Sequence, residues 1–559
     1  MERWQSGDRI TLESSPSGPG TADGNHMISA VATSQANLLI VNGRPWPPST
    51  GRTAIAVAGE SIVALGTDAE IRELAAPGAR VLDAAGGTVI PAFNDAHVHF
   101  LSGCRSLAGL DLFGAADLAA VRAAIAAFLA AGKAGPWLVG RGWQYAAFPG
   151  GMPALELLDR ACPDRPAYLE AYDGHTAWVN SPALRLAGAS GEALRTGILK
   201  EAAMATVECV LPAPTFEEDL AALRRGMAVA AARGVGSVQE AGAGQDQLAL
   251  YQALRERGHL TLRMRLGFDL PPGLTAAAWE QRLDQYAESS AGLDGRWLSG
   301  GILKAFADGV IESRTAALLR PYEGVESLGE PNWDWSELRR AVVEAHRRGW
   351  QVQVHAIGDA AVRAALDAFE AAAAERPPVD LRHRVEHVET ISAADLPRFG
   401  RLGVIASMQP SHAEPGRNLR EAWAPRIGAE RAGRGWAWGS ILRTGGRLAF
   451  GSDWPVVPLD PGHALHVAVH RTTAAGEPAG GWLPGERISL PEALAAHTGG
   501  AAYAEGAEAW KGSLRLGQVA DLALLGEDLF RPGLELAALK IRATVVGGRV
   551  VYEEGGSAS

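Results

Sequence analysis

The 559-residue chain has a hydrophobic fraction of 47% and a charged fraction of 21%, which is the balance of a globular protein and excludes a disordered or fibrous one. Its length exceeds the roughly 250–300 residues at which one hydrophobic core stops growing, so a large domain with additions, or several domains, is expected. The net charge of −11 is spread along the chain without clustered Lys and Arg, which argues against a nucleic-acid partner.

The amino-terminal segment differs in composition from the rest of the chain. Residues 1–36 are rich in Ser, Gly and Pro, as in SSPSGPGTADGN, and we expect them to form a disordered extension. Met27 is an alternative natural start, which leaves open whether residues 1–26 are native. No run reaches the ~18 apolar residues of a membrane span, and no signal peptide is evident. Three separated cysteines without a CxxC pair fit a reducing cytoplasm.

Short β-rich pieces with glycine turns occupy both ends of the remaining chain. They run over residues 37–90, beginning with LLIVNGRPW, and return over residues 506–555 with SLRLGQVADLALLG and IRATVVGGRVVYE. We predict that the two regions pair into one small β-sandwich domain. Two unrelated β appendages are the alternative.

Residues 91–505 alternate strand-like runs with Ala-rich helical segments. One helix is expected between Asp334 and Arg348, where Asp334 caps the start and Gly349 ends the helix before the strand-like run WQVQVHAIGD. Strands separated by helices favour parallel βα units, and we predict an α/β fold of the (β/α)8 TIM-like barrel type. The strand-like runs exceed eight, and the surplus is placed in an insertion around residues 136–230.

Two histidines end the first strand-like run of the predicted barrel, in the sequence PAFNDAHVH. Because strand side chains alternate between faces, Asp95, His97 and His99 are predicted to point the same way, which brings two imidazoles together. Two polar residues on an exposed strand face would give the same pattern. The pair alone therefore does not establish a metal site.

Further ligand-type residues stand at the ends of later strand-like runs: Lys304 in GGILKAFADG, His355 in VQVHAIGD, His387 in RVEHVE and Asp453 in AFGSDWP. In a (β/α)8 barrel, the carboxyl ends of different strands converge on one site, however distant they are in sequence. Each residue alone is explained equally well as a hydrogen-bonded core residue. Their joint position at strand ends predicts one metal centre.

Together, HVH, the strand lysine, the single histidines and SDWP resemble the amidohydrolase superfamily. The segments DGHTAWVNSPAL, LKAFADGVIESRTAAL, HAIGDAAV, EHVE and GSDWPV resemble its amidohydrolase family 3 branch, the YtcJ-like proteins that include N-substituted formamide deformylases. The resemblance covers roughly residues 37–555. One departure is Ala92, where the family usually has glycine after the proline, and we expect it to affect backbone packing more than catalysis.

The resemblance implies a role for each predicted ligand. His97, His99 and Asp453 would hold one divalent metal ion, and His355 and His387 would hold a second. Lys304, carboxylated on its amine by carbon dioxide, would bridge the two ions. An unmodified ammonium has no lone pair to offer a cation, so a single-metal site is the alternative if the lysine is unmodified.

The imidazole and carboxylate set suits zinc, with iron or manganese as substitutes. A bound metal would lower the pKa of its water from about 15.7 to about 7 and make hydroxide the nucleophile at neutral pH. Within a catalytic set of Asp453, Lys304 and His355, Asp453 would take the proton of that water and pass it to the leaving nitrogen.

A second group of residues is expected to line the substrate pocket. Asp173 and His175, flanked by Tyr172 and Trp178, suit an inserted lid, and an ordinary polar turn explains them equally well. The other predicted pocket residues are Trp143, Tyr145, Arg314 and Gln409.

Two more histidines lie close in sequence to predicted site residues. His383 has the same strand parity as His387 but lies further from the strand end, so a structural role is expected. His412, after the run MQP, is the remaining histidine most expected to approach the site.

The predicted function is hydrolysis of a carbon–nitrogen bond other than a peptide bond. A linear amide, with an N-substituted formamide as the best single substrate, comes from the resemblance alone, because a fold does not fix a substrate. The alternatives are a cyclic amidase or deaminase of the same superfamily, and a metal-binding relative without turnover. The expected partner is a small-molecule amide. Barrels of this kind often form homodimers, but no sequence feature marks an interface.

Overall fold

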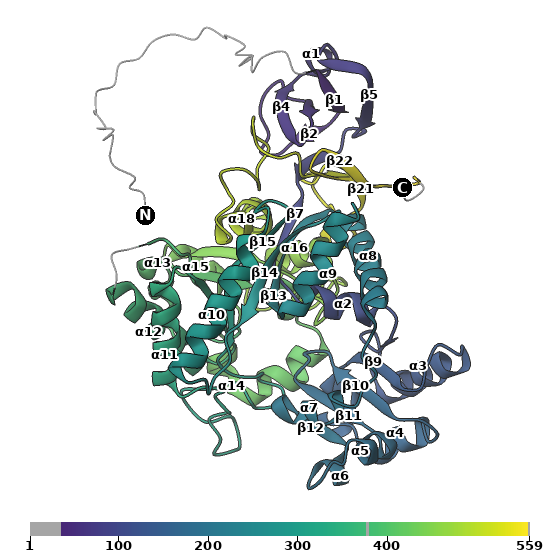
Figure 1. Ribbon diagram of the computed structural model, residues 1–559, viewed down its shortest axis with the longest axis vertical. Helices are drawn as coiled ribbons and strands as arrows, with labels where there is room; N and C mark the ends of the chain where they lie inside the picture. The colour runs from purple at the N-terminus through teal and green to yellow at the C-terminus, as the bar shows by residue number, and fades with distance from the viewer. Residues whose placement is uncertain (1–34, 376–378, 557–559) are drawn as a thin grey trace. The chain divides into compact units, whose positions relative to one another are not determined.

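The computed structural model describes residues 35–375 and 379–556, and its central element is an eight-stranded parallel sheet (Figure 1). The extension predicted over residues 1–36 lies outside the described residues as far as residue 34, and Ala36 already begins a strand. The sheet comprises β7 (Phe93–Val98), β13 (Val235–Ala243), β14 (Arg263–Asp269), β15 (Leu298–Phe306), β16 (Gln351–Ala356), β17 (Arg384–His387), β18 (Ile405–Met408) and β19 (Arg447–Phe450).

The first and last strands of this sheet meet, which curls it into a barrel. Asp453 N donates to His97 O at 2.7 Å, and His99 N donates to Trp454 O at 2.8 Å, so the chain after β19 runs beside the end of β7. Because all strands are parallel, their carboxyl ends lie at one end of the barrel. The predicted (β/α)8 barrel is therefore confirmed.

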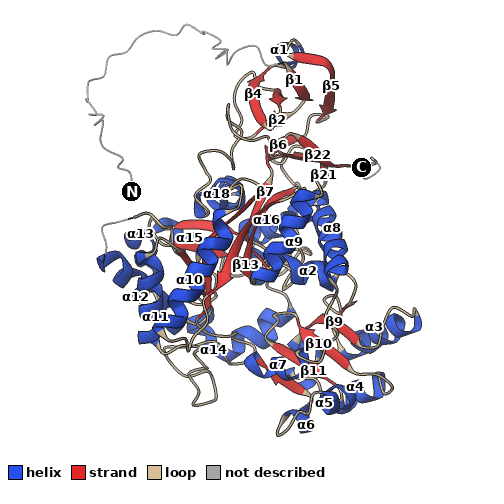
Figure 2. Cartoon of the chain, viewed as in Figure 1, coloured by secondary structure: helices blue, strands red, loops and turns tan. Residues whose placement is uncertain are grey.

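Helices cover the outside of the barrel, as the blue ribbons around the red strands of Figure 2 show. The strand β16 is buried along its whole length, since helices pack on its outer face and its inner face fills the barrel. The helices of this layer are α2 (Phe100–Ser106), α8 (Phe216–Ala232), α9 (Gln245–Glu256), α10 (Ala276–Ala291), α11 (Trp335–Arg347), α12 (Asp359–Glu375), α13 (Leu396–Leu402), α15 (Trp438–Arg443), α16 (Pro461–His470) and α17 (Leu490–Ala495). Two further helices lie elsewhere: α14 (Ala424–Ala432) packs on the preceding segment Leu419–Trp423, and the carbonyls of α18 (Ala501–Ala504) accept hydrogen bonds from Gln239 and Gln351 of the sheet.

Helix α11 forms where the sequence predicted it. The Asp334 carboxylate accepts hydrogen bonds from the backbone N–H groups of Ser336 and Glu337, which satisfies donors that the first turn leaves free. Leu338, Val342 and other apolar residues face the barrel from one side of the helix. In the part of the chain that the structure describes, no helix combines the length and apolar character of a bilayer crossing.

The two terminal regions form a pair of packed sheets. One sheet contains β4 (Ser61–Gly66), β3 (Ala54–Ala58), β1 (Ala36–Val41) and β5 (Ala75–Asp83), and the helix α1 (Asp68–Arg72) follows β4. The other contains β2 (Arg44–Pro45), β6 (Thr88–Pro91), β20 (Leu522–Leu525), β21 (Ile541–Val546) and β22 (Arg549–Glu553). Side chains of both ends, such as Leu38, Ile55 and Leu522, share one core. The predicted sandwich is confirmed.

A separate five-stranded sheet lies between β7 and β13 along the chain. It contains β8 (Leu110–Asp111), β9 (Leu138–Trp143), β10 (Ala167–Ala171), β11 (Thr176–Val179) and β12 (Ile198–Lys200), with helices α3 (Leu118–Ala130), α4 (Leu155–Ala161), α5 (Ser181–Leu186), α6 (Ala193–Thr196) and α7 (Ala205–Glu208).

The boundaries of this insertion differ from the expected 136–230. The sheet already begins at Leu110. The sequence did not indicate this start, because the first strand is only two residues long and carries no strand pattern. Helix α8, which the expected insertion included up to residue 230, instead packs on α2 and β13 of the barrel. Its apolar stripe, with Leu223 and Met227 buried, is that of a barrel helix.

Candidate metal centre

The six residues predicted as metal ligands come together at the carboxyl end of the barrel strands. They are His97 and His99 at the end of β7, Lys304 in β15, His355 in β16, His387 in β17 and Asp453 after β19. Their strands are spread over more than 350 residues of sequence, and only the closure of the barrel brings them to one place.

Distances within the cluster are those of side chains in direct contact. The Nε2 atoms of His97 and His99 lie 3.5 and 3.4 Å from Asp453 Oδ1. Lys304 Nζ lies 3.2 Å from His97 Nε2. On the other side of the cluster, His387 Nδ1 lies 3.8 Å from Asp453 Oδ2, and the ring centres of His355 and His387 are 4.5 Å apart.

Three of these residues meet a simple geometric requirement for a metal site. The ligand atoms of His97, His387 and Asp453 all lie within 4.8 Å of one another, and all three residues are buried. Asp453 Oδ1 is buried without a hydrogen-bond partner, although a lone buried carboxylate oxygen is costly. Imidazole nitrogen and carboxylate oxygen are donors that zinc and similar divalent ions bind. The donor set therefore fits a divalent metal.

Irregular backbone at the strand ends turns two of these side chains into the site. His387 has φ 72 and Asp453 has φ 59, both in the left-handed region that residues other than glycine rarely adopt. Strand alternation alone would place His387 on the outer face with His383. Instead His383 stacks on Phe369 of α12 at 4.8 Å and bonds to His346, which is a structural position.

Residues inside the barrel hold the imidazoles in place. Glu386 Oε2 accepts a hydrogen bond from His97 Nδ1 at 2.6 Å, and Glu386 is paired in turn with Arg384 at 3.0 Å, with none of the three exposed. Gln409 Oε1 lies 2.9 Å from His387 Nδ1. A bond to one ring nitrogen fixes the tautomer and directs the other nitrogen, as around bound metals in general. Glu386 was not among the predicted residues.

Burial sets the charge state of the cluster. Burial raises the pKa of Asp453 to about 7, although Lys304 opposes this, and burial lowers the pKa of Lys304 to about 8. Burial, with Lys304 nearby, also lowers the pKa of His97 well below its usual range. The imidazole is therefore neutral, which is the form that offers a lone pair to a metal.

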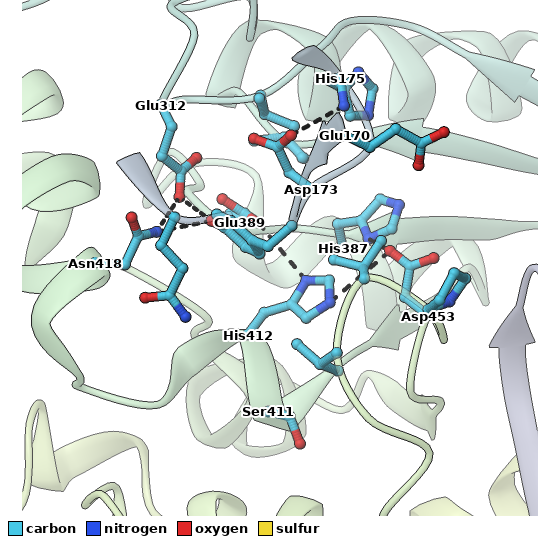
Figure 3. A pocket seen from close by; sticks show the side chains of 18 of the residues that line it. Glu170, Asp173, His175, Glu312, His387, Glu389, Ser411, His412, Asn418 and Asp453 are labelled. Carbon is cyan, nitrogen blue, oxygen red and sulfur yellow. Dashed lines mark hydrogen bonds and ion pairs between the residues drawn. The ribbon is translucent and has the colours of Figure 1, made fainter. Parts of the chain in front are cut away.

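A cavity of about 380 Å³ opens beside the cluster, and Figure 3 shows side chains that line it. Of the predicted pocket residues, Asp173 and His175 line this cavity, and Gln409 lies buried against His387. Trp143 and Tyr145 do not line it.

The other predicted pocket residues have different surroundings. The Trp143 indole donates to Leu169 O, and the Tyr145 hydroxyl bonds to Thr176, so both lie in the core of the insertion. Arg314 is exposed and is not among the residues that line the cavity. Aromatic character suggested a pocket wall for the first two, but the same character favours core packing.

The cavity also contains residues that the sequence analysis did not select. Glu312 accepts from the Tyr172 hydroxyl and, at 3.2 Å, from Asn418 Nδ2. Glu389 Oε2 accepts from the Trp423 indole at 2.6 Å. Both carboxylates follow barrel strands, in LKAFADGVIES and EHVE, and their position after a strand end was the available signal.

His412, which the sequence analysis singled out after MQP, lies between two carboxylates of the site. Its Nδ1 is 3.9 Å from Glu389 Oε1, and its Nε2 is 3.9 Å from Asp453 Oδ2. Its ring lies parallel to that of His387, with 6.1 Å between the centres. In Figure 3 Glu312 and Glu389 lie to the left of His412 and Asp453 lies to its right.

Known proteins resemble this chain over most of its length. Residues 80–552 match the family model described as "Amidohydrolase family". The chain is 30% identical over 546 residues to Protein LONG AFTER FAR-RED 3 of Arabidopsis thaliana, with 92% of each protein covered. It is 27% identical over 553 residues to the N-substituted formamide deformylase of Arthrobacter pascens, covering 94% of this chain and 100% of that protein.

A solved structure also resembles this chain in sequence and fold. The crystal structure of an uncharacterized metal-dependent hydrolase from Pyrococcus furiosus is 27% identical in sequence and superposes with a TM-score of 0.66. The match covers 87% of this chain and 98% of the other.

Proposed function

The chain belongs to the amidohydrolase family, and on that premise we propose that it is a metal-dependent hydrolase of carbon–nitrogen bonds other than peptide bonds. Linear amides are the proposed substrates, with N-substituted formamides as the best single class. The proposal depends on one observation, the meeting of His97, His387 and Asp453 with a carboxylate oxygen that lacks a partner. The names of the Arthrobacter and Pyrococcus proteins support the reaction and the metal.

In the proposed centre, His97, His99 and Asp453 hold one divalent ion, zinc by the chemistry of the ligands. His355 and His387 would hold a second ion, and Lys304, as a carbamate, would be shared by both. The place of Lys304 supports this, because its Nζ is enclosed among the predicted ligands, 3.2 Å from His97 Nε2. An ammonium has no lone pair with which to bind a cation, whereas a carbamate has oxygen donors. If Lys304 is unmodified, the centre holds a single ion.

When bound, the metal supplies a Lewis acid that polarises the amide carbonyl and brings the pKa of water near neutrality. Asp453 takes the proton of the attacking water and delivers it to the leaving nitrogen. The cavity encloses the substrate and limits the access of other water.

The test measures metal content and turnover in the same preparation. Zinc-loaded protein is given N-alkyl formamides, N-alkyl acetamides and cyclic amides, and the release of amine, acid and ammonia is followed. His97→Asn should lose zinc and turnover, whereas His259→Asn, on an exposed histidine, should retain both. Zinc without turnover on any amide would contradict the proposal, and turnover confined to the cyclic amides would point to a cyclic amidase.

A further inference from the structure

Three buried carboxylates face the same cavity as the candidate metal centre. Asp173 comes from the insertion, Glu312 from the segment after β15 and Glu389 from the segment after β17, and all three line the cavity. Their exposed fractions are only 7%, 4% and 7%. Across residues 35–375 and 379–556, no Lys or Arg forms an ion pair with any of them.

Their hydrogen-bond partners bring no counter-charge, and burial raises the pKa of all three carboxyl groups, so that a bound cation would favour their ionised form. Glu312 accepts from Tyr172 and Asn418, and Glu389 accepts from a tryptophan indole, all of which are neutral donors. Asp173 Oδ1 accepts from a backbone N–H, and Asp173 Oδ2 is buried without a partner. A buried carboxylate without a counter-charge is costly, and three together repel one another.

The arginines that line the cavity do not supply the missing charge. Arg141 Nε lies 3.6 Å from Glu170 Oε2, and Arg417 Nε lies 2.8 Å from Glu421 Oε2. Each arginine therefore lies beside a carboxylate that is not one of these three. Among the described residues, the side of the cavity that Asp173, Glu312 and Glu389 line therefore holds three carboxyl groups without a paired Lys or Arg.

The arrangement fits an organic cation better than a metal ion. Within the described residues, His97, His387 and Asp453 are the only group of three or more His, Cys, Asp and Glu residues whose ligand atoms all lie within 4.8 Å of one another. The three carboxylates are therefore set wider than the shell of one ion. Tyr172, Trp423 and Trp436 line the same cavity, and aromatic faces attract ammonium and guanidinium groups.

We propose that the substrate is an amide that carries a protonated amine or guanidinium, and that Asp173, Glu312 and Glu389 bind this cationic group. The inference rests on the proposed hydrolase function. The position of His412 indicates how far this subsite lies from the metal centre. Its imidazole separates Glu389 from Asp453, with 3.9 Å from the ring to each carboxylate. A short alkyl chain between the cationic group and the scissile amide spans this separation.

Binding of simple cations tests the subsite independently of turnover. Isothermal titration of zinc-loaded protein compares pentylguanidinium with 1-pentanol and pentanoate, which share the chain and differ in the head group. Pentylguanidinium should bind at least about tenfold more tightly than either, because the contact is charge-assisted. Equal binding of pentanol or pentanoate would overturn the proposal.

Charge-removing variants locate the contact. Glu312→Gln and Asp173→Asn should each weaken pentylguanidinium binding by about tenfold or more. The matched control is Glu527→Gln, the same change on a surface carboxylate paired with Arg531 and not among the residues that line the cavity, where affinity should stay within about twofold. Thermal unfolding establishes that each variant is folded, and if one is not, the other decides. Wild-type affinity in a folded Glu312→Gln or Asp173→Asn variant would overturn the proposal.

Turnover separates this inference from the proposed function. The formamide of 5-guanidinopentylamine should have a kcat/KM at least about tenfold above that of N-hexylformamide, its neutral counterpart. Hydrolysis of both without a preference would overturn the cationic subsite alone. Guanidinium binding without hydrolysis of any amide would support the subsite and contradict the hydrolase function.

Discussion

Replacing Glu386 by Gln tests whether the interior of the barrel sets the geometry of the metal centre. Glu386 Oε2 lies 2.6 Å from His97 Nδ1, and its other oxygen lies 3.0 Å from Arg384 Nε, with no exposed surface on any of the three residues. Glutamine keeps the size of the side chain and one acceptor oxygen, but it removes the charge that holds both partners.

The expected effect has two parts. Loss of a partner behind a metal-binding imidazole typically weakens metal affinity about 10–100-fold, or about 1.4–2.7 kcal/mol. Breaking a buried ion pair from one side costs about 3–5 kcal/mol of stability. Arg384 still bonds to Gln239, Gln353 and the Ala96 carbonyl, so we expect the lower end, about 3 kcal/mol.

Two measurements check this expectation. Competition with a fluorescent zinc indicator gives the metal affinity, and urea unfolding of the metal-free protein gives the stability. The matched control is Glu527→Gln, which removes a carboxylate from a surface pair with Arg531 and should change neither value measurably. Zinc affinity equal to that of the wild type in folded Glu386→Gln would refute the reasoning.

Three further changes follow from the geometry of the site. Asp453→Asn should lower kcat about 10²–10⁴-fold at saturating zinc, measured as amine release, and unchanged kcat would exclude the carboxylate as the proton acceptor. Gln409→Leu removes the acceptor 2.9 Å from His387 Nδ1 and should weaken zinc binding about tenfold in a chelator competition, whereas equal affinity would show that this bond does not position the ring. Gly451→Ala would place a methyl group 2.5 Å from the backbone nitrogen of His97, so Tm and zinc content should both fall, and a variant with wild-type values would contradict the packing between β19 and β7.

The convergence of the predicted ligands was accessible from sequence because it needs only residue types at strand ends. Once parallel strands are expected, His97, Lys304, His355 and Asp453 fall at carboxyl ends, and barrel closure brings such ends together whatever the loop lengths. The sandwich was accessible for a similar reason, since both terminal regions carry short apolar strands that need a common core.

The support behind the imidazoles was not accessible in the same way. In RVEH, strand alternation places Glu386 and His387 on opposite faces, so the sequence pattern argues against a shared site. The positive φ of His387 breaks that alternation and turns its side chain into the barrel end where Glu386 already holds His97. The direction of the His387 side chain therefore depends on its backbone conformation, which the residue pattern does not predict.

The walls of the cavity depend on packing between distant segments. Trp143 and Tyr145 are aromatic residues near a predicted pocket, but their hydrogen bonds and contacts lie within the insertion. Asp173, Glu312 and Glu389 reach the cavity from three separate segments, and of these only Asp173 was predicted as a pocket residue from the sequence. Only the assembled structure shows that their charges face one another.

A crystal structure of the zinc-loaded protein tests the central claim most directly. The account predicts zinc within about 2.0–2.2 Å of a ligand atom of each of His97, His387 and Asp453. Crystals grown at saturating zinc in which these three side chains contact no ion would contradict it.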